Sequence, residues 1–185
     1  MPASKVPPAL LVQAAETPLG ALLLVADAEG FLRAAEFEAC ESRLRRHFDR
    51  RLGPAGYRLS PGCVPPTITA ALASYFAGDF DAIRSIALKP DGTPFQNQVW
   101  AALRAIEPGD TLTYAGLAAR LGRPQAARAV GHANAANPFS IIIPCHRLIG
   151  ADGGLTGYAG GVRRKRWLLD HETRKPFAVS KPFTI

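Results

Sequence analysis

The sequence predicts an α+β fold, with a small N-terminal sheet-plus-helix domain followed by a mostly helical C-terminal domain that contains a helix-turn-helix. Two observations support this prediction. Apolar runs of strand length, separated by turn signals, are concentrated near the start of the chain, whereas amphipathic helix periodicity dominates beyond residue 94. A segment rich in Gly and Pro, about residues 78–94, is the expected linker. It divides the chain into domains 1–88 and 89–185.

The predicted N-terminal domain combines short strands with two helices. Strands are expected at Leu10–Val12, Ala21–Ala26 and Phe31–Phe37. Helices are expected at Arg43–Leu52 and Pro66–Phe76, where apolar side chains recur at helical spacing, and residues 52–66 are expected to form a loop. No set of residues in this half has the pattern of a catalytic or metal site. We therefore expect it to act as a scaffold.

The C-terminal domain is expected to contain three successive helices. Phe95 to Ile106 carries an apolar stripe of the first helix, and Thr113 is a suitable N-cap for a short second helix that ends at Gly122. Pro124 is well placed at the start of the third helix, which runs from residue 125 to about residue 136. A short helix, a tight turn containing Gly and a further helix form a helix-turn-helix pattern.

The third helix has unusually small side chains for a helix that reads DNA sequence. Recognition helices specify bases through long polar side chains in the major groove, and Arg128 is the obvious one here. Such a helix would approach DNA closely but discriminate sequence poorly, so we expect recognition of shape or of a lesion. The alternative is that the small residues only permit tight packing between helices.

The positive charge lies entirely in the second half of the chain. Residues 89–185 contain 13 Lys and Arg against 6 Asp and Glu, whereas residues 1–88 contain 9 of each kind. A basic surface of this kind suits a polyanion such as nucleic acid. The alternative is a basic surface that only keeps the protein in solution.

Composition excludes several classes of protein. The chain is 48% hydrophobic and 20% charged, which is typical of a folded domain, and no run reaches the roughly 18 apolar residues of a membrane helix. Neither a signal peptide nor a disulfide framework is evident, since the three cysteines are Cys40, Cys63 and Cys145. We expect a cytoplasmic protein without a metal site, associated with the nucleoid if the chain is bacterial.

The chemistry is expected around Cys145. Ile141–Ile143 predicts a short buried strand, ended by Pro144, with the cysteine just after it. A cysteine thiolate is a strong nucleophile, and the neighbouring His146 and Arg147 could lower the pKa of the thiol. Adjacent side chains of an extended chain point to opposite sides, so either the chain turns at Cys145 or His146 acts through water. Glu172 is a candidate for the acid that orients His146, and a buried, unreactive cysteine is the alternative.

An ordered set of motifs resembles the O6-alkylguanine-DNA alkyltransferases over about residues 90–172. The motifs are Pro94-Phe95-Gln96, Val99-Trp100, Thr113-Tyr114, Ala127-Arg128-Ala129-Val130-Gly131, Asn137-Pro138, Pro144-Cys145-His146-Arg147, Leu155-Thr156-Gly157-Tyr158-Ala159-Gly160-Gly161 and Lys165-Arg166-Trp167-Leu168-Leu169. Each motif alone is a moderate signal, but the ordered set is specific.

The resemblance implies DNA repair by direct reversal of damage. The expected partner is double-stranded DNA containing O6-alkylguanine, entered from the minor groove with the damaged nucleotide flipped out, because the alkylated oxygen is inaccessible inside the duplex. Arg128 matches the arginine that fills the gap left by the base, and Ala127, Gly131 and Arg123 are expected beside the DNA. We expect a monomer, and cooperative binding along DNA remains open.

The resemblance also implies a methylated-DNA–[protein]-cysteine S-methyltransferase that acts once. Cys145 would accept the alkyl group irreversibly, because a thioether does not leave readily. Tyr114 would rotate the nucleotide and help to protonate guanine, while Glu172, His146 and a water keep Cys145 ionised. Asn137 would tie the helix-turn-helix to the active-site loop, and Leu148, Tyr158 and Ala159 would line the guanine pocket. No cofactor is expected, since the DNA itself brings the alkyl group.

Two other functions remain to be distinguished. A sensor of alkylated bases that performs no repair would lack the acceptor, so Cys145 argues against it. A cysteine hydrolase would need an oxyanion hole and would leave the helix-turn-helix unexplained. The effects of His132, Asn134 and Ala159, which depart from the family pattern, stay open. The segment after Glu172 lies outside the matched pattern and is expected to be a loosely docked extension.

Overall fold

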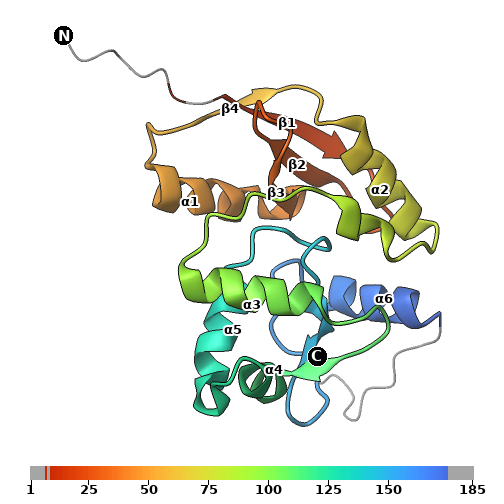
Figure 1. Cartoon of the computed structure of the whole chain (residues 1–185). Coiled ribbons are helices and arrows are strands. Elements are labelled where there is room, and N and C mark those ends of the chain that lie inside the picture. The colour runs from red at the N-terminus through yellow and green to blue at the C-terminus, as the bar shows by residue number, and fades with distance from the viewer. Residues whose placement is uncertain (1–6, 8, 175–185) are drawn as a thin grey trace.

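The computed structural model describes residue 7 and residues 9–174. A sheet with two helices forms one half of the molecule, and helices α3 to α6 form most of the other (Figure 1). The predicted α+β class is confirmed. The extension expected after Glu172 lies almost entirely outside the described residues. Within the described part of the chain, no helix has both the length and the apolar character needed to cross a membrane.

The sheet has four strands in the order β3-β2-β1-β4. They are β1 (Ala9–Ala15), β2 (Leu22–Ala26), β3 (Leu32–Phe37) and β4 (Arg58–Pro61). Neighbouring strands are antiparallel except β4, which runs parallel to β1 with Leu59 opposite Leu10. Strand β4 lies in the segment that was expected to be a loop. Its four residues are too few to show periodicity, and its pairing partner lies far back along the chain.

Two helices cover opposite faces of the sheet because side chains of a strand alternate between its faces. Helix α1 (Glu41–Leu52) packs Leu44 and Phe48 against the face that carries Leu23 and Val25. Helix α2 (Pro66–Phe76) packs Ile68, Leu72 and Tyr75 in the core that contains Leu22 and Leu24. The predicted bounds of α2 are confirmed.

The second half is mostly helical. Its longer elements are α3 (Pro94–Arg104), α4 (Tyr114–Arg120), α5 (Ala127–Ala135) and α6 (Val162–Thr173), with the short strands β5 (Leu112–Thr113) and β6 (Leu148–Ile149) paired in parallel. Single 3-10 turns are η1 (Glu38–Cys40), η2 (Ala82–Ser85), η3 (Pro124–Ala126) and η4 (Cys145–Arg147). Thr113 caps α4 as predicted, since its hydroxyl accepts from the backbone N–H of Gly116.

The strand predicted at Ile141–Ile143 is wrong. These residues form successive tight turns, in which the backbone N–H of Ile142 donates to Ser140 and that of Ile143 donates to Phe139. Ile141 has a φ of 72°, a left-handed conformation that is rare for a β-branched residue. All three side chains are buried, so the apolar run that predicted a strand reflects burial within a coiled loop. Such a run cannot be assigned to a strand by pattern alone.

The two halves share one hydrophobic core and a backbone pairing. The core joins Leu22 and Phe37 of the sheet to Trp100 and Ile143 of the second half. At the edge of the sheet, the N–H of Ala35 donates to Pro138 at 2.9 Å, and that of Ser140 donates to Ala35 at 2.7 Å. The loop before Cys145 therefore pairs with the edge strand β3 at Ala35, while Leu32 at the start of the same strand pairs with residues 87–89. The division into domains 1–88 and 89–185 stays a prediction.

Candidate functional site

A cavity of about 370 Å³ opens beside Cys145. Of the residues to which the sequence assigned a catalytic, pocket or DNA-contacting role, six line it: Tyr114, Gly131, Asn137, Cys145, Tyr158 and Ala159. They come from α4, from α5, from the loop after α5, from η4 and from the loop between β6 and α6. The remaining lining residues are Arg43, Asn134, Ala135, Ser140 and Gly157. The cavity is mostly apolar, with a few polar groups that converge on it, which is typical of a small-ligand site.

Asn137 holds the loop that carries Cys145. Its amide group donates to the carbonyl of Ile143 at 3.0 Å, and its side-chain oxygen accepts from the N–H of Phe139 at 3.0 Å. The side chain is buried, so both bonds are shielded from water. It thus replaces the backbone pairing that a strand would have supplied and fixes the turns between α5 and η4.

Cys145 begins the 3-10 turn η4, so the chain does turn at the cysteine. Its side chain is 6% exposed. Burial raises the pKa of the Cys145 thiol, although the Asn137 amide and the positive charges of Arg43 and Lys165 act in the opposite direction. The resting thiol is therefore mostly protonated at neutral pH, and a base is needed to make the thiolate.

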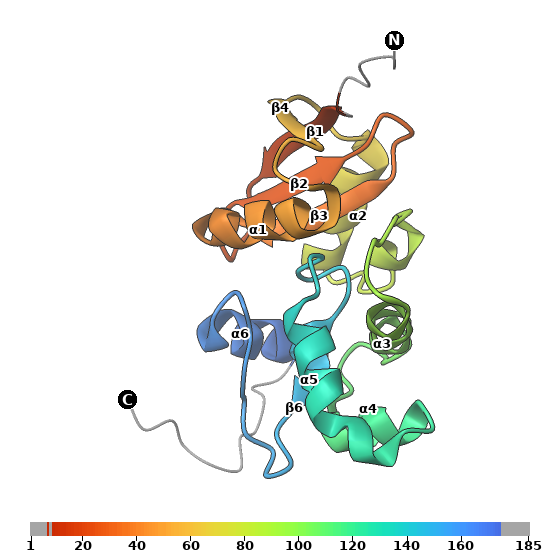
Figure 2. The ribbon, with the colours of Figure 1, turned by 90° about the vertical axis from the view of Figure 1, so that its left-hand side faces the viewer.

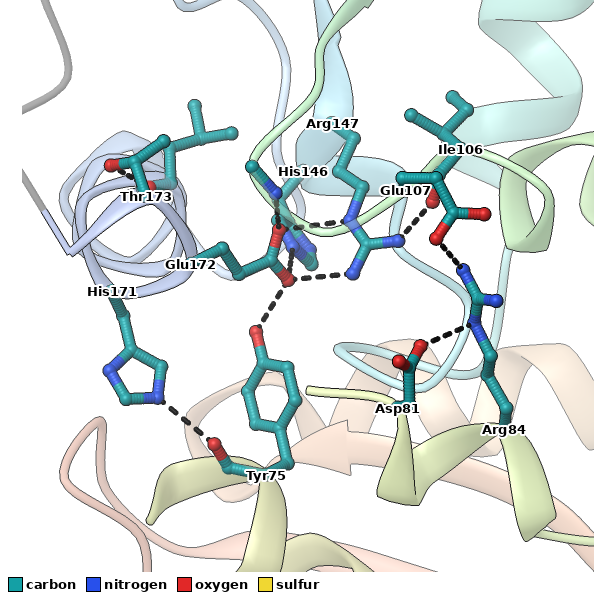
Figure 3. Close-up of polar contacts among 12 residues, drawn as sticks. Tyr75, Asp81, Arg84, Ile106, Glu107, His146, Arg147, His171, Glu172 and Thr173 are labelled. Atoms are coloured by element: carbon teal, nitrogen blue, oxygen red, sulfur yellow. Dashed lines mark hydrogen bonds and ion pairs between the residues drawn. The ribbon is translucent and has the colours of Figure 1, made fainter. Parts of the chain in front are cut away.

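Glu172 is the centre of a buried polar cluster behind η4 (Figure 3). Arg147 binds its two oxygens with Nε and Nη2, each at 2.9 Å, and the Tyr75 hydroxyl donates to Oε1 at 2.8 Å. His146 Nε2 lies 2.9 Å from the same Oε1. Burial opposes ionisation, yet the hydrogen bonds from His146 and Arg147 and the positive charge of Arg147 outweigh it and hold the pKa of Glu172 well below its usual range. The carboxylate is thus ionised.

The cluster determines which nitrogen of His146 carries a proton. Burial lowers the pKa of His146, although Glu172 acts in the opposite direction, so the ring is neutral at neutral pH. An ionised carboxylate can only accept, so Nε2 must be the protonated nitrogen. Nδ1 is then an acceptor, and it is buried without a hydrogen-bond partner among the described residues. His146 is therefore arranged as a general base: its Nδ1 can accept a proton, and the carboxylate of Glu172 orients the ring through Nε2.

A second buried carboxylate, Glu36 of β3, anchors the other side of the loop. Arg43 of α1 forms an ion pair with it and also donates to the carbonyls of Ala135 and Asn137, at 2.6 and 2.7 Å. The Ser140 hydroxyl donates to Glu36 at 2.9 Å. The first half of the chain thereby contacts the loop on both sides of Asn137.

Lys165 of α6 is fully buried, and its ammonium group donates to the carbonyls of Leu148 and Thr156. Burial lowers its pKa to about 8, while a charge on Cys145 raises it. The two carbonyls belong to the segments that flank the cavity. Lys165 thus ties the loop between β6 and α6 to strand β6. Leu148, expected in the guanine pocket, is not among the residues that line the cavity.

Two tyrosines face Cys145. Burial raises the pKa of Tyr114, although a hydrogen bond with Thr156 lowers it, and burial raises the pKa of Tyr158 well above its usual value. Both hydroxyls remain protonated at neutral pH. The Tyr158 hydroxyl and the side-chain oxygen of Asn134 are buried without a hydrogen-bond partner among the described residues. These atoms are free to meet a ligand in the cavity.

The expected DNA-contacting residues lie outside the cavity, except Gly131. Arg128 is exposed on α5, and Ala127 is half-buried in its first turn. Arg123 is exposed before η3, with its guanidinium 5.2 Å from the centre of the Phe95 ring. Helix α5 therefore links an exposed arginine at its start to the cavity at its far end.

Within residues 9–174, no three or more His, Cys, Asp or Glu side chains come together in a group that could hold a metal ion.

Comparison with known proteins identifies the family. The family model described as "6-O-methylguanine DNA methyltransferase, DNA binding domain" matches residues 94–174. A methylated-DNA–protein-cysteine methyltransferase of Salmonella typhimurium is 50% identical over 163 residues, which are 88% of this chain and 95% of the relative. The chain belongs to the methylated-DNA–protein-cysteine methyltransferase family. The activity of this family is DNA repair by transfer of a methyl group from O6-methylguanine to a cysteine of the protein.

More distant members of the methyltransferase family agree with this assignment. The relative from Methanosarcina acetivorans is 40% identical over 157 residues, covering 85% of this chain and 94% of its own length. A crystal structure of Mycobacterium tuberculosis OGT in complex with DNA matches with a TM-score of 0.72 and 39% identity. That match covers 90% of this chain and 95% of the other. DNA is thus a partner of the family.

Sequence reasoning missed several groups of this methyltransferase site. Arg147 and Lys165 stood inside the quoted motifs. Arg147 was expected to act on the pKa of Cys145, whereas its contact with Glu172 was not expected, and no role was assigned to Lys165. Tyr75, Glu36 and Arg43 belong to no motif, and they reach the site only because the two halves pack together. Nothing in the local pattern of the first half indicates them.

Proposed function

We propose that this chain repairs O6-alkylguanine in double-stranded DNA by one irreversible transfer of the alkyl group to Cys145. The observation that carries the proposal is the placement of a buried cysteine in a cavity at the end of α5, next to a neutral histidine that is oriented by an ionised carboxylate. The protein would act as a monomer, with domain 89–185 binding DNA. Its place would be the cytoplasm, at the nucleoid if the chain is bacterial.

DNA binding is proposed to occur through the minor groove. Helix α5 presents small side chains along the surface that leads to the cavity, so the helix can approach the duplex closely. Arg128 is proposed to fill the space of the extruded nucleotide. Ala127, Gly131 and Arg123 are proposed to lie along the sugar-phosphate backbone of the DNA. Flipping a nucleotide out of the duplex costs a few kcal/mol, and less when the lesion is weakly paired.

The proposed reaction is a single displacement. His146 Nδ1 accepts the Cys145 proton through a water molecule, and Glu172 stabilises the imidazolium that results. The thiolate then forms a bond to the alkyl carbon as the bond from that carbon to O6 breaks, and the electron pair passes to the guanine ring. Tyr114, kept protonated by burial, donates a proton to the leaving guanine and recovers one from the imidazolium through water. Cysteine becomes a thioether, and guanine is restored.

A thioether at Cys145 is proposed to end the activity of the molecule. Among the residues that line the cavity, Cys145 carries the one thiol, and none of the others would displace an alkyl group from sulfur. Each molecule would therefore repair one base without a cofactor.

The deciding experiment mixes the protein with duplex DNA carrying one O6-methylguanine and weighs the intact protein by mass spectrometry. The expected result is one added methyl group per molecule, mapped to Cys145, and none with Cys145→Ala. The variant should still bind the duplex. Lesion binding without an adduct would favour the sensor, and sustained ester or peptide hydrolysis would favour the cysteine hydrolase.

Arg128→Ala separates flipping from chemistry. It should slow transfer from duplex DNA by about tenfold or more while sparing the reaction with free O6-benzylguanine, because the free base needs no extrusion. The measurement compares the two transfer rates. Equal loss with both substrates would contradict the proposed role of Arg128.

A further inference from the structure

A second cleft lies beside the cavity, between the two halves of the molecule. It has a volume of about 310 Å³ and is formed by α1 together with the end of α5 and the loop that follows it. We name it the α1 cleft; its lining includes Arg43, Arg46, Arg50, Arg51, Ala135 and Pro138. Figure 2 shows α1 next to the end of α5, with both helices on the side that faces the viewer.

The basic residues of the α1 cleft form one stripe of the helix. Arg43, Arg46, His47 and Arg50 follow the spacing i, i+3, i+4 and i+7, which places them on the same side of α1. Like charges at this spacing repel one another and destabilise a helix. The last two arginines also suit the negative end of the helix dipole, but Arg46 lies too early in α1 for that explanation.

Only part of this charge is neutralised within the protein. Arg43 is paired with Glu36, His47 lies 3.0 Å from Asp91, and Arg51 donates to Gln96. Arg46 and Arg50 are exposed, and neither forms an ion pair or a hydrogen bond with another described residue. Two free guanidinium groups, four residues apart, therefore face the α1 cleft.

The α1 cleft adjoins the proposed DNA surface. Arg43 and Ala135 line both the cleft and the cavity of Cys145, so a nucleotide in the cavity would have its neighbours at the mouth of the cleft. A helix is about 10 Å across or more, whereas the minor groove is about 6 Å wide. If α5 enters the minor groove, the two sugar-phosphate backbones that border the groove must then lie against the elements on either side of α5. On one side that element is α1.

We propose that the α1 cleft binds a phosphodiester group of the DNA beside the flipped nucleotide, with Arg46 and Arg50 as its ligands. The inference rests on the proposed function, because it assigns a second contact to the same DNA. Guanidinium groups match the geometry of phosphate oxygens and remain charged at all relevant pH values. Two groups in the cleft would repel an anion, the carboxylate of Glu36 and the carbonyl of Ala135 at the end of α5. Both are already bound by Arg43.

The test measures binding of the full-length protein to a duplex that carries one O6-methylguanine and is short enough for one bound molecule. The protein is Cys145→Ala, alone or with Arg46→Gln and Arg50→Gln. Loss of the two charges should reduce the slope of log affinity against log salt by about 1 to 2, and weaken binding by roughly tenfold at low salt. Arg58→Gln, which removes an exposed arginine of β4 away from the cleft, is the control and should leave the slope unchanged.

A second measurement separates the inference from the function on which it rests. With Cys145 intact, the Arg46→Gln/Arg50→Gln variant should react with free O6-benzylguanine at the rate of the unaltered protein. If the unaltered protein reacts and the salt slope is the same in variant and control, the phosphate site is wrong while the proposed function stands. If the unaltered protein takes no alkyl group from either substrate, the proposed function is wrong.

A third outcome would assign the cleft to a different partner. A longer duplex accommodates several molecules, and the unaltered protein and the variant can be compared for cooperative binding. An unchanged slope on the short duplex, with cooperativity lost on the long one, would mean that the arginines contact a second copy of the chain, and would overturn the proposal.

Discussion

The two buried glutamates of the site, Glu172 and Glu36, belong to different halves of the chain, and each receives a hydrogen bond from the opposite half. Glu172 belongs to the last helix, and the first half of the chain contributes Tyr75 to it. Glu36 belongs to the sheet, and the second half contributes Ser140 to it. Each cluster contains one arginine, Arg147 in the first and Arg43 in the second.

The difference lies in what each carboxylate holds. Glu172 contacts His146, the base proposed for the reaction, so its charge acts on the chemistry. Glu36 contacts Arg43 and Ser140, so it acts on the position of the loop that contains Asn137. The first half of the molecule thus completes the site in two ways. Through Tyr75 it supports the carboxylate that orients His146, and through Glu36 and Arg43 it supports the backbone of the loop that contains Asn137.

The largest expected effect comes from Glu172→Gln, compared with Glu36→Gln. Glu172→Gln leaves the buried Arg147 without its carboxylate, so it should lower the free energy of unfolding by about 3 to 5 kcal/mol. Glu36→Gln leaves the half-buried Arg43 without its carboxylate and should cost less stability. Glu172→Gln should also slow transfer from free O6-benzylguanine by about a hundredfold or more, because His146 loses its orienting charge. Urea unfolding and single-turnover kinetics give the two numbers.

Glu36→Gln is expected to affect stability more than the transfer reaction. It should slow transfer by less than about tenfold, since removing the support leaves the base itself in place. Measurements at a temperature where both variants remain folded exclude loss of the fold as the cause. Equal loss of transfer in the two variants would show that the clusters do not differ in role.

A smaller effect is expected from Tyr75→Phe, matched by Ser140→Ala. Each removes one hydroxyl that donates to a carboxylate, and such a hydrogen bond contributes about 1.5 to 3 kcal/mol to stability. Tyr75→Phe should slow transfer severalfold, whereas Ser140→Ala should lower stability alone. Thermal unfolding and the transfer rate test the pair, and a slower reaction in Ser140→Ala only would reverse the assignment.

The smallest expected effect is on pH dependence. Because burial lowers the pKa of His146, the histidine remains neutral somewhat below its ordinary pKa of about 6.5, and the rate of transfer from free O6-benzylguanine to Cys145 should stay level there. The rate falls only as the pH drops through the lowered pKa. A decline that begins above pH 6.5 in the unaltered protein would contradict His146 as the base.

Acid should weaken the fold for a related reason. The pKa of Glu172 is depressed in the folded protein, so its contribution to stability is complete above the unfolded value of about 4.3. That contribution is lost progressively as the pH falls below this value toward the depressed pKa. Glu172→Gln should flatten this part of the stability profile, as measured by urea unfolding between neutral and acid pH.

The sequence predicts what depends on neighbours along the chain. Helix α2, the cap at Thr113 and the pair α4 and α5 arise from local spacing, and the cysteine motif indicates its chemistry by composition. Tyr75 and Glu172 lie 97 residues apart, and Ser140 and Glu36 lie 104 apart. Such contacts exist only after the halves have packed. The loop at Ile141 escaped prediction because Asn137 and burial impose its turns.

The order of the two clusters along the chain has a consequence for synthesis. A chain is made from its N-terminus, so Cys145 leaves the ribosome before Glu172, and Glu36 and Arg43 precede both. A nascent chain therefore has its acceptor thiol and the support for the loop, while the carboxylate that orients His146 is still missing. An acceptor that can be used once would then remain unreactive until α6 has folded onto the finished molecule, and damaged DNA would meet only complete proteins.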